Sequence, residues 1–168
     1  MVVKLRTITK GGETVAKLCF FIGHRECPYA IRGKLDKAVE HVIREKGIQV
    51  FVVGQYGNFD QMAASAVKGM KHKYSDISLW LLLPYHPSER PIEATEGFDG
   101  TYYPEGQEFV PKRIAIVKAN QTMVDQCDVL IAYAKGPGNS RNLVEYAERK
   151  DVEIINLAKK SEEAREVL

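Results

Sequence analysis

The stretch that decides the fold is Lys17-Leu-Cys-Phe-Phe-Ile22, followed at once by Gly23-His-Arg-Glu-Cys-Pro28. Apart from Lys17, the first six residues are apolar, and such a run is typical of a strand buried on both faces of a sheet. Gly23 ends the run and lets the chain turn sharply. The stretch therefore predicts a central strand whose exit carries polar and cationic side chains.

Further apolar runs alternate with segments in which apolar residues recur at helical spacing, the mark of parallel βαβ units. Thr7 to Thr14, around Gly11-Gly12, has the pattern of a hairpin. The prediction is one α/β domain spanning 1–168, with an N-terminal hairpin, a mainly parallel five-stranded sheet and helices on both faces. The expected strands are 17–22, 48–53, 77–83, 129–133 and 152–157.

The periodic pattern dissolves between Pro84 and Pro111, where prolines and glycines are frequent. A connection of this length inside a compact domain is usually functional or mobile. The segment 84–112 is therefore either a lid over a site or a long surface excursion. The residues alone leave both alternatives open.

Bulk composition excludes several classes of protein. The 168 residues are 45% hydrophobic and 27% charged with a net charge of +2, which is ordinary for a globular domain and indicates neither nucleic acid nor a membrane surface as a partner. No apolar run is long enough to span a bilayer, and Met1–Lys10 lacks the pattern of a secretory signal. Cysteines at 19, 27 and 127 have neither metal-ligand spacing nor an even number, so no metal site is expected. A reducing cytoplasm fits, which for a phage-encoded chain would be that of the host cell.

In an open parallel sheet, ligands bind outside the carboxyl ends of the strands. The first exit offers Gly23, His24 and Arg25. Arg25 can donate a planar fork to a phosphate or carboxylate, and His24 can donate a hydrogen bond or move a proton. The alternative is a tight turn in which His24 packs and Arg25 pairs with Glu26.

The second exit, Gly54-Gln-Tyr-Gly-Asn-Phe-Asp60, places two glycines just before a predicted helix. Backbone N–H groups at a helix start favour anions. Asp60 would repel a nearby phosphate and suits a helix cap or a partner of ribose hydroxyls better. Tyr56 either stacks on a base or is an ordinary loop residue.

The exit of the predicted strand 129–133 is the strongest candidate for a phosphate cradle. It reads Tyr133-Ala-Lys-Gly-Pro-Gly-Asn-Ser-Arg-Asn142, with small residues at a helix start, a hydroxyl at Ser140 and positive charge at Lys135 and Arg141. It is neither the Walker loop nor a G-x-G-x-x-G fingerprint.

Asn120 lies on the apolar stripe of its predicted helix, where its amide bonds either neighbouring loops or a ligand. No catalytic residue is assigned and no cofactor is required. The predicted ligand-binding residues are Gly23, His24, Arg25, Gly54, Gln55, Tyr56, Gly57, Asp60, Tyr85, Asn120, Tyr133, Lys135, Gly136, Gly138, Asn139, Ser140 and Arg141.

As an ordered set, these stretches resemble the SLOG superfamily, the Rossmann-like group that contains the DprA and LOG proteins, in its YpsA-like branch. The resemblance implies a Rossmann-like domain with a pocket for nucleotides or nucleotide-derived signals. The matching segments are 20–25, 51–60, 82–85, 103–105, 120–125 with Asp128, 138–147 and 154–157.

Two departures from the family pattern bear on catalysis. LOG-type enzymes cleave the base–ribose bond of nucleoside monophosphates with an arginine four residues before the methionine matched by Met123, and this position is Ala119. Their glutamate three residues after the threonine of the glycine motif falls at Leu143, if Ser140 stands for that threonine. Cleavage of an N-glycosidic bond needs charge stabilisation and usually a carboxylate. The departures argue against turnover.

Three functions remain open at this stage. The first is non-catalytic binding, by sensing or sequestering, of a nucleotide-like small molecule such as a cyclic ADP-ribose. The second is a LOG-like nucleoside-monophosphate phosphoribohydrolase that uses His24, Asp60 or Glu145. The third is a protein-interaction module with a vestigial pocket. A homo-oligomer is a further expectation, with Trp80, Tyr102 and Tyr103 as aromatic candidates for its interface. Trp80 lies in the middle of a predicted strand, so the sequence favours the core for it.

Overall fold

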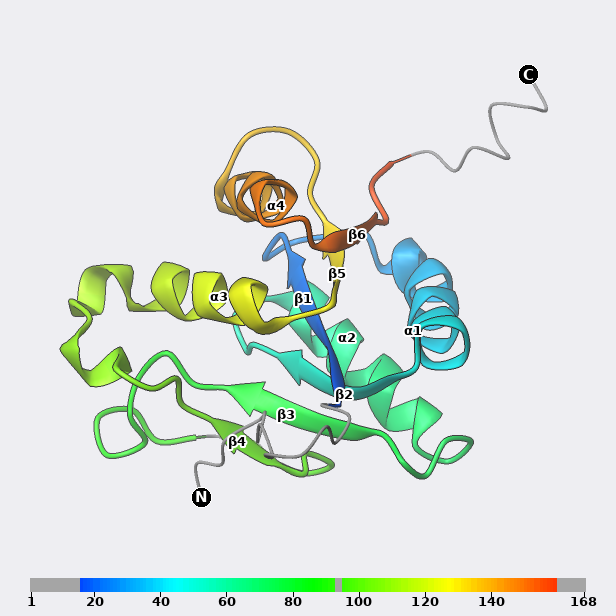
Figure 1. Ribbon diagram of the computed structural model, residues 1–168, viewed down its shortest axis with the longest axis horizontal. Coiled ribbons are helices and arrows are strands. Elements are labelled where there is room, and N and C mark those ends of the chain that lie inside the picture. The colour runs from blue at the N-terminus through cyan, green and yellow to red at the C-terminus, as the bar shows by residue number, and fades with distance from the viewer. Residues whose placement is uncertain (1–15, 93–94, 160–168) are drawn as a thin grey trace, which may run out of the picture.

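The computed structural model describes residues 16–92 and 95–159 (Figure 1). Within these residues the strands form one sheet of six in the order β4-β3-β2-β1-β5-β6, and every neighbouring pair is parallel. The hairpin predicted at Thr7 to Thr14 lies outside the described residues. The strands are β1 Lys17–Gly23, β2 Ile48–Val53, β3 Ser78–Leu82, β4 Gly100–Tyr102, β5 Val129–Tyr133 and β6 Glu153–Asn156.

Helices cover both faces of the sheet, as predicted. The core on one face is built with α1 and α2, and the core on the other with α3 and α4. The bounds are α1 Arg32–Lys46, α2 Asn58–Met70, α3 Ala115–Gln126 and α4 Asn139–Arg149, with short 3₁₀ turns η1 Tyr29–Ile31, η2 Gln107–Phe109 and η3 Lys112–Ile114.

The central strand β1 shows why the two layers form. Its side chains alternate between the two faces, so that Phe21 joins the core under α1 and α2 while Phe20 joins the core under α3 and α4. Both rings are fully buried. Burial of large apolar side chains on each face contributes about 2–3 kcal/mol per residue, which explains the near-continuous apolar run.

The prediction of five strands was wrong by one. β4 has three residues, Gly100–Tyr102, and pairs with β3 at the edge of the sheet. So short a strand produces no periodic pattern, and the prolines and glycines around it hide the β-favouring Thr101 and Tyr102. The segment 84–112 therefore contains a strand and a 3₁₀ turn, with a second 3₁₀ turn beginning at its end, rather than irregular chain throughout.

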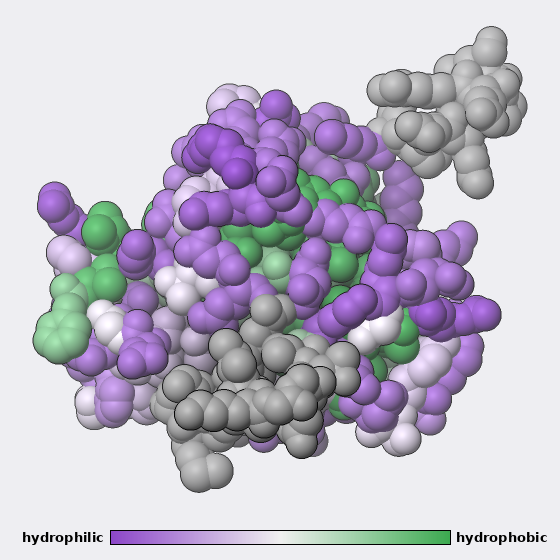
Figure 2. Space-filling model, viewed as in Figure 1, coloured by the Kyte–Doolittle hydropathy of each residue, from purple (hydrophilic) through white to green (hydrophobic). Residues whose placement is uncertain are grey.

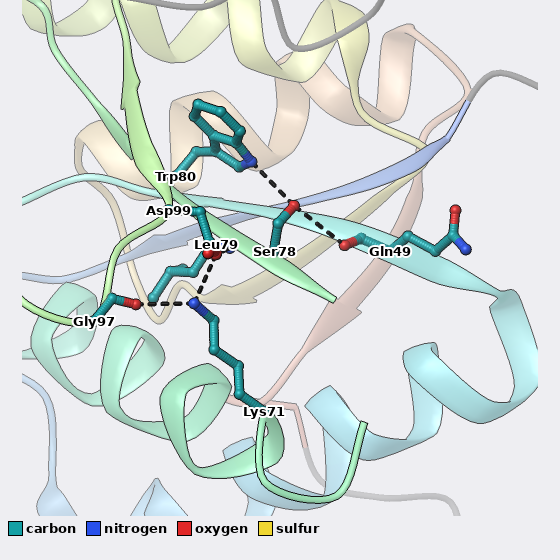
Figure 3. A network of polar contacts seen from close by, with 7 residues as sticks. All are labelled: Gln49, Lys71, Ser78, Leu79, Trp80, Gly97 and Asp99. Carbon is teal, nitrogen blue, oxygen red and sulfur yellow. Dashed lines mark hydrogen bonds and ion pairs between the residues drawn. The ribbon is translucent and has the colours of Figure 1, made fainter. Parts of the chain in front are cut away.

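Asp99 fastens β4 to the rest of the fold (Figure 3). Its carboxylate accepts hydrogen bonds from the backbone N–H of Leu79 at 2.7 Å and from Lys71 Nζ at 2.6 Å. Lys71, which follows α2, also donates to the carbonyl of Gly97 at 3.0 Å. On the neighbouring strand, Trp80 Nε1 donates to Ser78 Oγ at 3.0 Å. These contacts join β4, β3 and the end of α2.

Gln107 braces the other end of the same segment. Its side chain is buried, and its amide donates to the carbonyl of Pro84 at 3.2 Å and to that of Ala115 at 2.8 Å. Pro84 follows β3 and Ala115 begins α3, so one side chain fixes the start of α3 against the exit of β3. Without these acceptors the buried amide would cost stability.

The three cysteines, Cys19, Cys27 and Cys127, are buried free thiols. Burial raises the pKa of Cys19 well above its ordinary value, and raises that of Cys27 with a further contribution from Asp60. Neutral, covered thiols react slowly.

Exposed apolar side chains gather where α3 begins, at the left in Figure 2. Phe109, Ile114 and Val117 are 85%, 44% and 38% exposed. Tyr102, one of the aromatic residues predicted for an interface, is instead buried, and the oligomer stays a prediction. Across residues 16–92 and 95–159, no helix has the length and apolar character required to cross a bilayer.

Candidate functional site

The strand order reverses at β1, which pairs with β2 on one side and with β5 on the other. Chain connections on the two sides of such a point diverge, so a crevice opens outside the carboxyl ends of the two strands. Gly23 and Tyr133 are paired at those ends. The fold therefore positions the first and third of the predicted loops at one edge.

A cavity of about 260 Å³ lies at this edge. The exits of β1, β2 and β3 and the beginnings of α2, α3 and α4 enclose it, so the sequence-distant turns do converge. Its volume is slightly below the 300–1,000 Å³ usual for small-molecule sites. The lining residues are Phe20, Phe21, Ile22, Gly23, His24, Arg25, Gly54, Tyr56, Asp60, Leu82, Pro84, Ile116, Asn120, Asn139, Ser140 and Leu143.

The start of α2 is bound tightly to the loop after β1. Asn58 accepts a hydrogen bond from the backbone N–H of Cys27 at 2.9 Å and donates to its carbonyl at 2.8 Å. The Asn58 backbone N–H donates to the carbonyl of Arg25 at 2.9 Å. Gly57 has φ +137°, and a Cβ there would lie 2.6 Å from Arg25 Cα. Only glycine fits this approach.

Asp60 brings a carboxyl group to the cavity from the first turn of α2. It accepts a hydrogen bond from the backbone N–H of Tyr56 at 3.0 Å. Burial nevertheless raises the pKa of Asp60 to about 6, because removal of water disfavours the charged form more than one hydrogen bond favours it. Among the lining residues of the described chain, Asp60 alone carries a carboxyl group. Near neutral pH it is an acceptor for donors on a guest.

The start of α4 has the same backbone form and lacks these internal contacts. Gly138 has φ +143°, close to the angle of Gly57, but a Cβ there would meet no atom within 4 Å. The first turn of α4 carries no acidic residue. In the described part of the chain, the backbone N–H groups of Asn139, Ser140 and Arg141 have no hydrogen-bond partner. This helix start can therefore accept an anion.

Ser140 adds a hydroxyl at the same place. It is only 8% exposed, lines the cavity, and makes no hydrogen bond to any described residue. Buried hydroxyls normally have a partner, since an unsatisfied one costs about 1–3 kcal/mol. Its missing partner is the strongest indication that this part of the cavity is built for a guest.

His24 connects the loops after β1 and β5. The backbone N–H of Lys135 donates to His24 Nε2 at 2.9 Å, and the Lys135 carbonyl lies 3.1 Å from the same nitrogen. The imidazole also packs edge-on against Tyr133, with ring centroids 5.7 Å apart. Both groups hold His24 in a structural position at the edge of the cavity.

On the other side of this loop, the side chain of Asn156 in β6 hydrogen-bonds to the backbone of Ala134. Its amide accepts from the Ala134 N–H and donates to the Ala134 carbonyl, both at 3.2 Å. These hydrogen bonds hold Ala134 in place, and the glycine turn begins directly after it. The position of Ala134 therefore preorganises the start of α4.

Two residues of α3 complete the wall. Asn120 and Ile116, one turn apart, both line the cavity. The Asn120 side chain has no hydrogen-bond partner among the described residues, so the structural role considered for it from sequence has no supporting contact here. Its amide can donate to or accept from a guest.

The rim beside β2 and β3 is aromatic and cationic. Arg90 Cζ lies 3.7 Å from the ring centroid of Tyr85, whose hydroxyl donates to the carbonyl of Lys112 at 3.1 Å. Burial raises the pKa of Tyr56, and hydrogen bonds from Gln55 and Arg90 to its side chain offset that rise in part. Tyr56 thus stays a neutral phenol between the cavity and Arg90.

The structure brings nine of the predicted residues into the lining and leaves eight beside it. Those in the lining are Gly23, His24, Arg25, Gly54, Tyr56, Asp60, Asn120, Asn139 and Ser140. Those outside it are Gln55, Gly57, Tyr85, Tyr133, Lys135, Gly136, Gly138 and Arg141.

Several of the eight position their neighbours. Gly57 and Gly138 begin α2 and α4, and Tyr133 packs on His24. Arg141 turns outward and pairs with Glu145 at 3.2 Å, so its charge does not point at the cavity. Lys135 contributes its backbone to the site rather than its ammonium group.

The lining residues that were not among the predicted ligand-binding residues are apolar: Phe20, Phe21, Ile22, Leu82, Pro84, Ile116 and Leu143. Each carries the periodic signal of a core residue, and nothing in that signal separates a core wall from a cavity wall. Leu143 matters most for the question of catalysis, because the resemblance to LOG-type enzymes predicts a glutamate at this position and the side chain here is aliphatic.

Comparison with protein-family models yields no match, and comparison with curated proteins yields none either. The SLOG resemblance therefore remains a reading of the motifs. No group of three histidine, cysteine or acidic side chains in residues 16–92 and 95–159 is placed to hold a metal ion. Chemically, the described site offers an open helix start, one titrating carboxyl, the cationic side chain of Arg25 and neutral hydrogen-bonding groups.

Proposed function

We propose that this protein binds a nucleotide or a nucleotide-derived signal in the cavity and releases it unchanged. The open start of α4, with the buried and unpartnered hydroxyl of Ser140, supports this most directly. A phosphate seated there would receive backbone N–H groups and the hydroxyl while gaining from the positive end of the helix.

Asp60 and Asn120 support the nucleoside part of the proposal. Asp60 accepts one internal hydrogen bond and lines the cavity, so its remaining acceptor capacity suits the hydroxyls of a ribose. The Asn120 amide can hydrogen-bond to the edge of the base, and the Tyr56 ring can stack on its face. The volume of about 260 Å³ holds at most a guest of roughly mononucleotide size.

The residues at the two positions where LOG-type enzymes carry catalytic groups support binding without turnover. Leu143 fills the inward position on α4, and Glu145 is paired with Arg141 on an exposed face. Ala119, the other position that departs from the LOG pattern, is fully buried in the core.

The test is calorimetric titration with a panel of purine and pyrimidine mononucleotides, followed by mass spectrometry of the ligand recovered after denaturation. We expect binding without conversion, and a higher unfolding temperature, because a ligand that binds only the folded state adds about 2.7 kcal/mol at 100 times its Kd. Ser140→Ala should weaken binding about tenfold. Ser140→Asp should abolish it, because the new carboxylate occupies the anion position.

Ser65→Ala is the matched control, since Ser65 is an exposed serine of α2 outside the cavity. It should leave affinity unchanged. Thermal unfolding of each variant without ligand separates lost binding from lost folding. If no nucleotide in the panel binds or raises the unfolding temperature, the proposal is overturned and a partner protein becomes the better hypothesis.

One observation favours hydrolysis as a second candidate. A carboxyl whose pKa is raised to about 6 can act as a general acid or base near neutral pH. Release of free base from a nucleoside monophosphate, lost in Asp60→Asn while the nucleotide still binds, would establish it. Recovery of every bound nucleotide intact would exclude it.

A further inference from the structure

The charges along the cavity edge follow the strand order. Arg90 comes after β3, Asp60 after β2, and the open start of α4 after β5, with β1 between the last two. Neighbouring strands are about 4.8 Å apart, so the exits of β3 and β5 are separated by roughly 14 Å. Arg25, which lines the cavity after β1, adds positive charge on the α4 side of Asp60. The arrangement is therefore one negative group, Asp60, with positive groups on each side of it.

Arg90 is preorganised for an anion. Its guanidinium stacks on Tyr85, with Cζ 3.7 Å from the ring centroid, and its charge acts on the side chain of Tyr56, a residue of the cavity wall. In the described residues no carboxylate pairs with Arg90, and the adjacent Glu89 lies 3.7 Å from Lys112 instead. A stacked guanidinium has already lost much of its side-chain freedom, so it loses less on binding.

Arg90 itself does not line the cavity, but it interacts with Tyr56, which does. An anionic group bound to Arg90 would therefore belong to a part of the guest that extends out of the cavity. Asp60 lies between this rim and α4, and its carboxylate would repel an anionic group placed at the centre. The favourable places for negative charge thus lie on opposite sides of Asp60: Arg90 on one side, and Arg25 with the start of α4 on the other.

We infer that the guest carries two anionic groups on either side of a ribose, one on the start of α4 and the other on Arg90 at the rim. This inference rests on the proposed function and narrows it to nucleoside bisphosphates and similarly substituted nucleotides. A ribose with a substituent on each side is a guest that places two anionic groups on opposite sides of Asp60. Asp60 then faces the free ribose hydroxyl.

The experiment compares AMP and GMP with the 3′,5′- and 2′,5′-bisphosphates of adenosine and guanosine by calorimetric titration. For the wild-type protein, at least one bisphosphate should bind about tenfold more tightly than its monophosphate, since it adds a charge-assisted contact. In Arg90→Met this tenfold preference should disappear, while the Kd of the monophosphate should change less than about twofold.

Arg149→Met is the matched control, because Arg149 also lies over a tyrosine ring, that of Tyr146, with 5.9 Å from Cζ to the centroid, and is not part of the cavity wall. It should keep the preference. Arg90→Lys retains the charge without the planar fork and should keep part of it. Thermal unfolding without nucleotide identifies any variant that has lost its fold.

The outcomes separate the two proposals. Equal affinities for mono- and bisphosphates in the wild-type protein would overturn the two-anion inference and leave nucleotide binding standing. An equal loss of both ligands in Arg90→Met would also overturn it, because Arg90 would then hold the same phosphate in each. If none of these nucleotides binds, nucleotide binding itself fails and the inference fails with it.

Discussion

Two helix starts in this protein share one backbone form and differ in what surrounds them. Gly57-Asn-Phe-Asp60 begins α2, and Gly138-Asn-Ser-Arg141 begins α4, each with a glycine at positive φ before the first helical residue. At α2 every position makes an internal contact, and Asp60 alone of the four also lines the cavity. At α4 the glycine is uncrowded, the asparagine is exposed, the serine hydroxyl has no described partner and the arginine points away.

The difference shows that, at one edge of the sheet, one helix start serves mainly the structure while the other is open to ligand binding. Packing around α2 fixes the shape of the cavity, whereas the free polar groups of α4 are available to a guest. Matched substitutions at equivalent positions of the two helices can therefore test the assignment one position at a time.

The second helical position should give the largest contrast. Phe59 is fully buried and packs against Gly23, so Phe59→Ala should lower the free energy of unfolding by about 3–5 kcal/mol. Ser140→Ala removes a buried hydroxyl without a described partner and should leave stability unchanged or raise it by about 1 kcal/mol. Urea unfolding followed by circular dichroism measures both. A clear loss in Ser140→Ala would mean that the hydroxyl is used by the folded protein itself.

The glycine before each helix should give the next largest contrast. Alanine at either position is strained by the backbone angle, at a cost of about 1–3 kcal/mol. Gly57→Ala also forces a Cβ to 2.6 Å from the Arg25 backbone, so it should cost about 3 kcal/mol or more, against about 1–2 kcal/mol for Gly138→Ala. Equal losses in the same urea titration would show that the close approach at α2 relaxes freely.

The third helical position predicts a pH dependence. The folded protein holds a proton on Asp60 up to about pH 6, whereas an ordinary carboxyl, as in the unfolded chain, releases it near 3.8. The contribution of Asp60 to the free energy of unfolding is therefore most favourable below pH 4 and falls by about 2–3 kcal/mol between pH 4 and pH 6.

Asp60→Asn should remove that fall from the stability curve measured across this range. Asn58→Ala adds no titrating group and should shift the curve without changing its slope. A wild-type and an Asp60→Asn curve of identical shape would contradict the raised pKa of Asp60.

The first helical position should give the smallest contrast. Asn58→Ala removes two hydrogen bonds to the Cys27 backbone and should cost about 1–2 kcal/mol. Asn139→Ala removes an exposed side chain with no described partner and should change stability by less than about 0.5 kcal/mol. Thermal unfolding of the pair is sufficient, and a smaller loss in Asn58→Ala than in Asn139→Ala would reverse the assignment.

The layered sheet and the three polar, glycine-containing loops after its strands could be predicted from sequence, because buried strands and glycine turns produce local sequence patterns. The run ending at Gly23 and the turn before Ser140 are examples, and both border the cavity. β4 could not be predicted, since three residues at an edge depend on Asp99 and Lys71 for their place rather than on any periodicity.

The distinction between the two helix starts could not be predicted from the sequence either. It depends on partners far away along the chain: Cys27 and Asn58 are 31 residues apart, and His24 and Lys135 are 111 apart. Arg90 was overlooked because its segment carries no pattern, and its significance follows from stacking on Tyr85 and contact with Tyr56.

The buried thiols give this protein built-in reporters of partial opening. Cys19 lies in the central strand, so a thiol reagent can reach it only when the sheet comes apart. Cys27 becomes accessible once the hydrogen bonds between the Asn58 side chain and the Cys27 backbone break. Labelling of Cys27 ahead of Cys19 would time the loosening of the cavity wall separately from global unfolding. A guest that holds the wall closed would slow the first rate without any engineered probe.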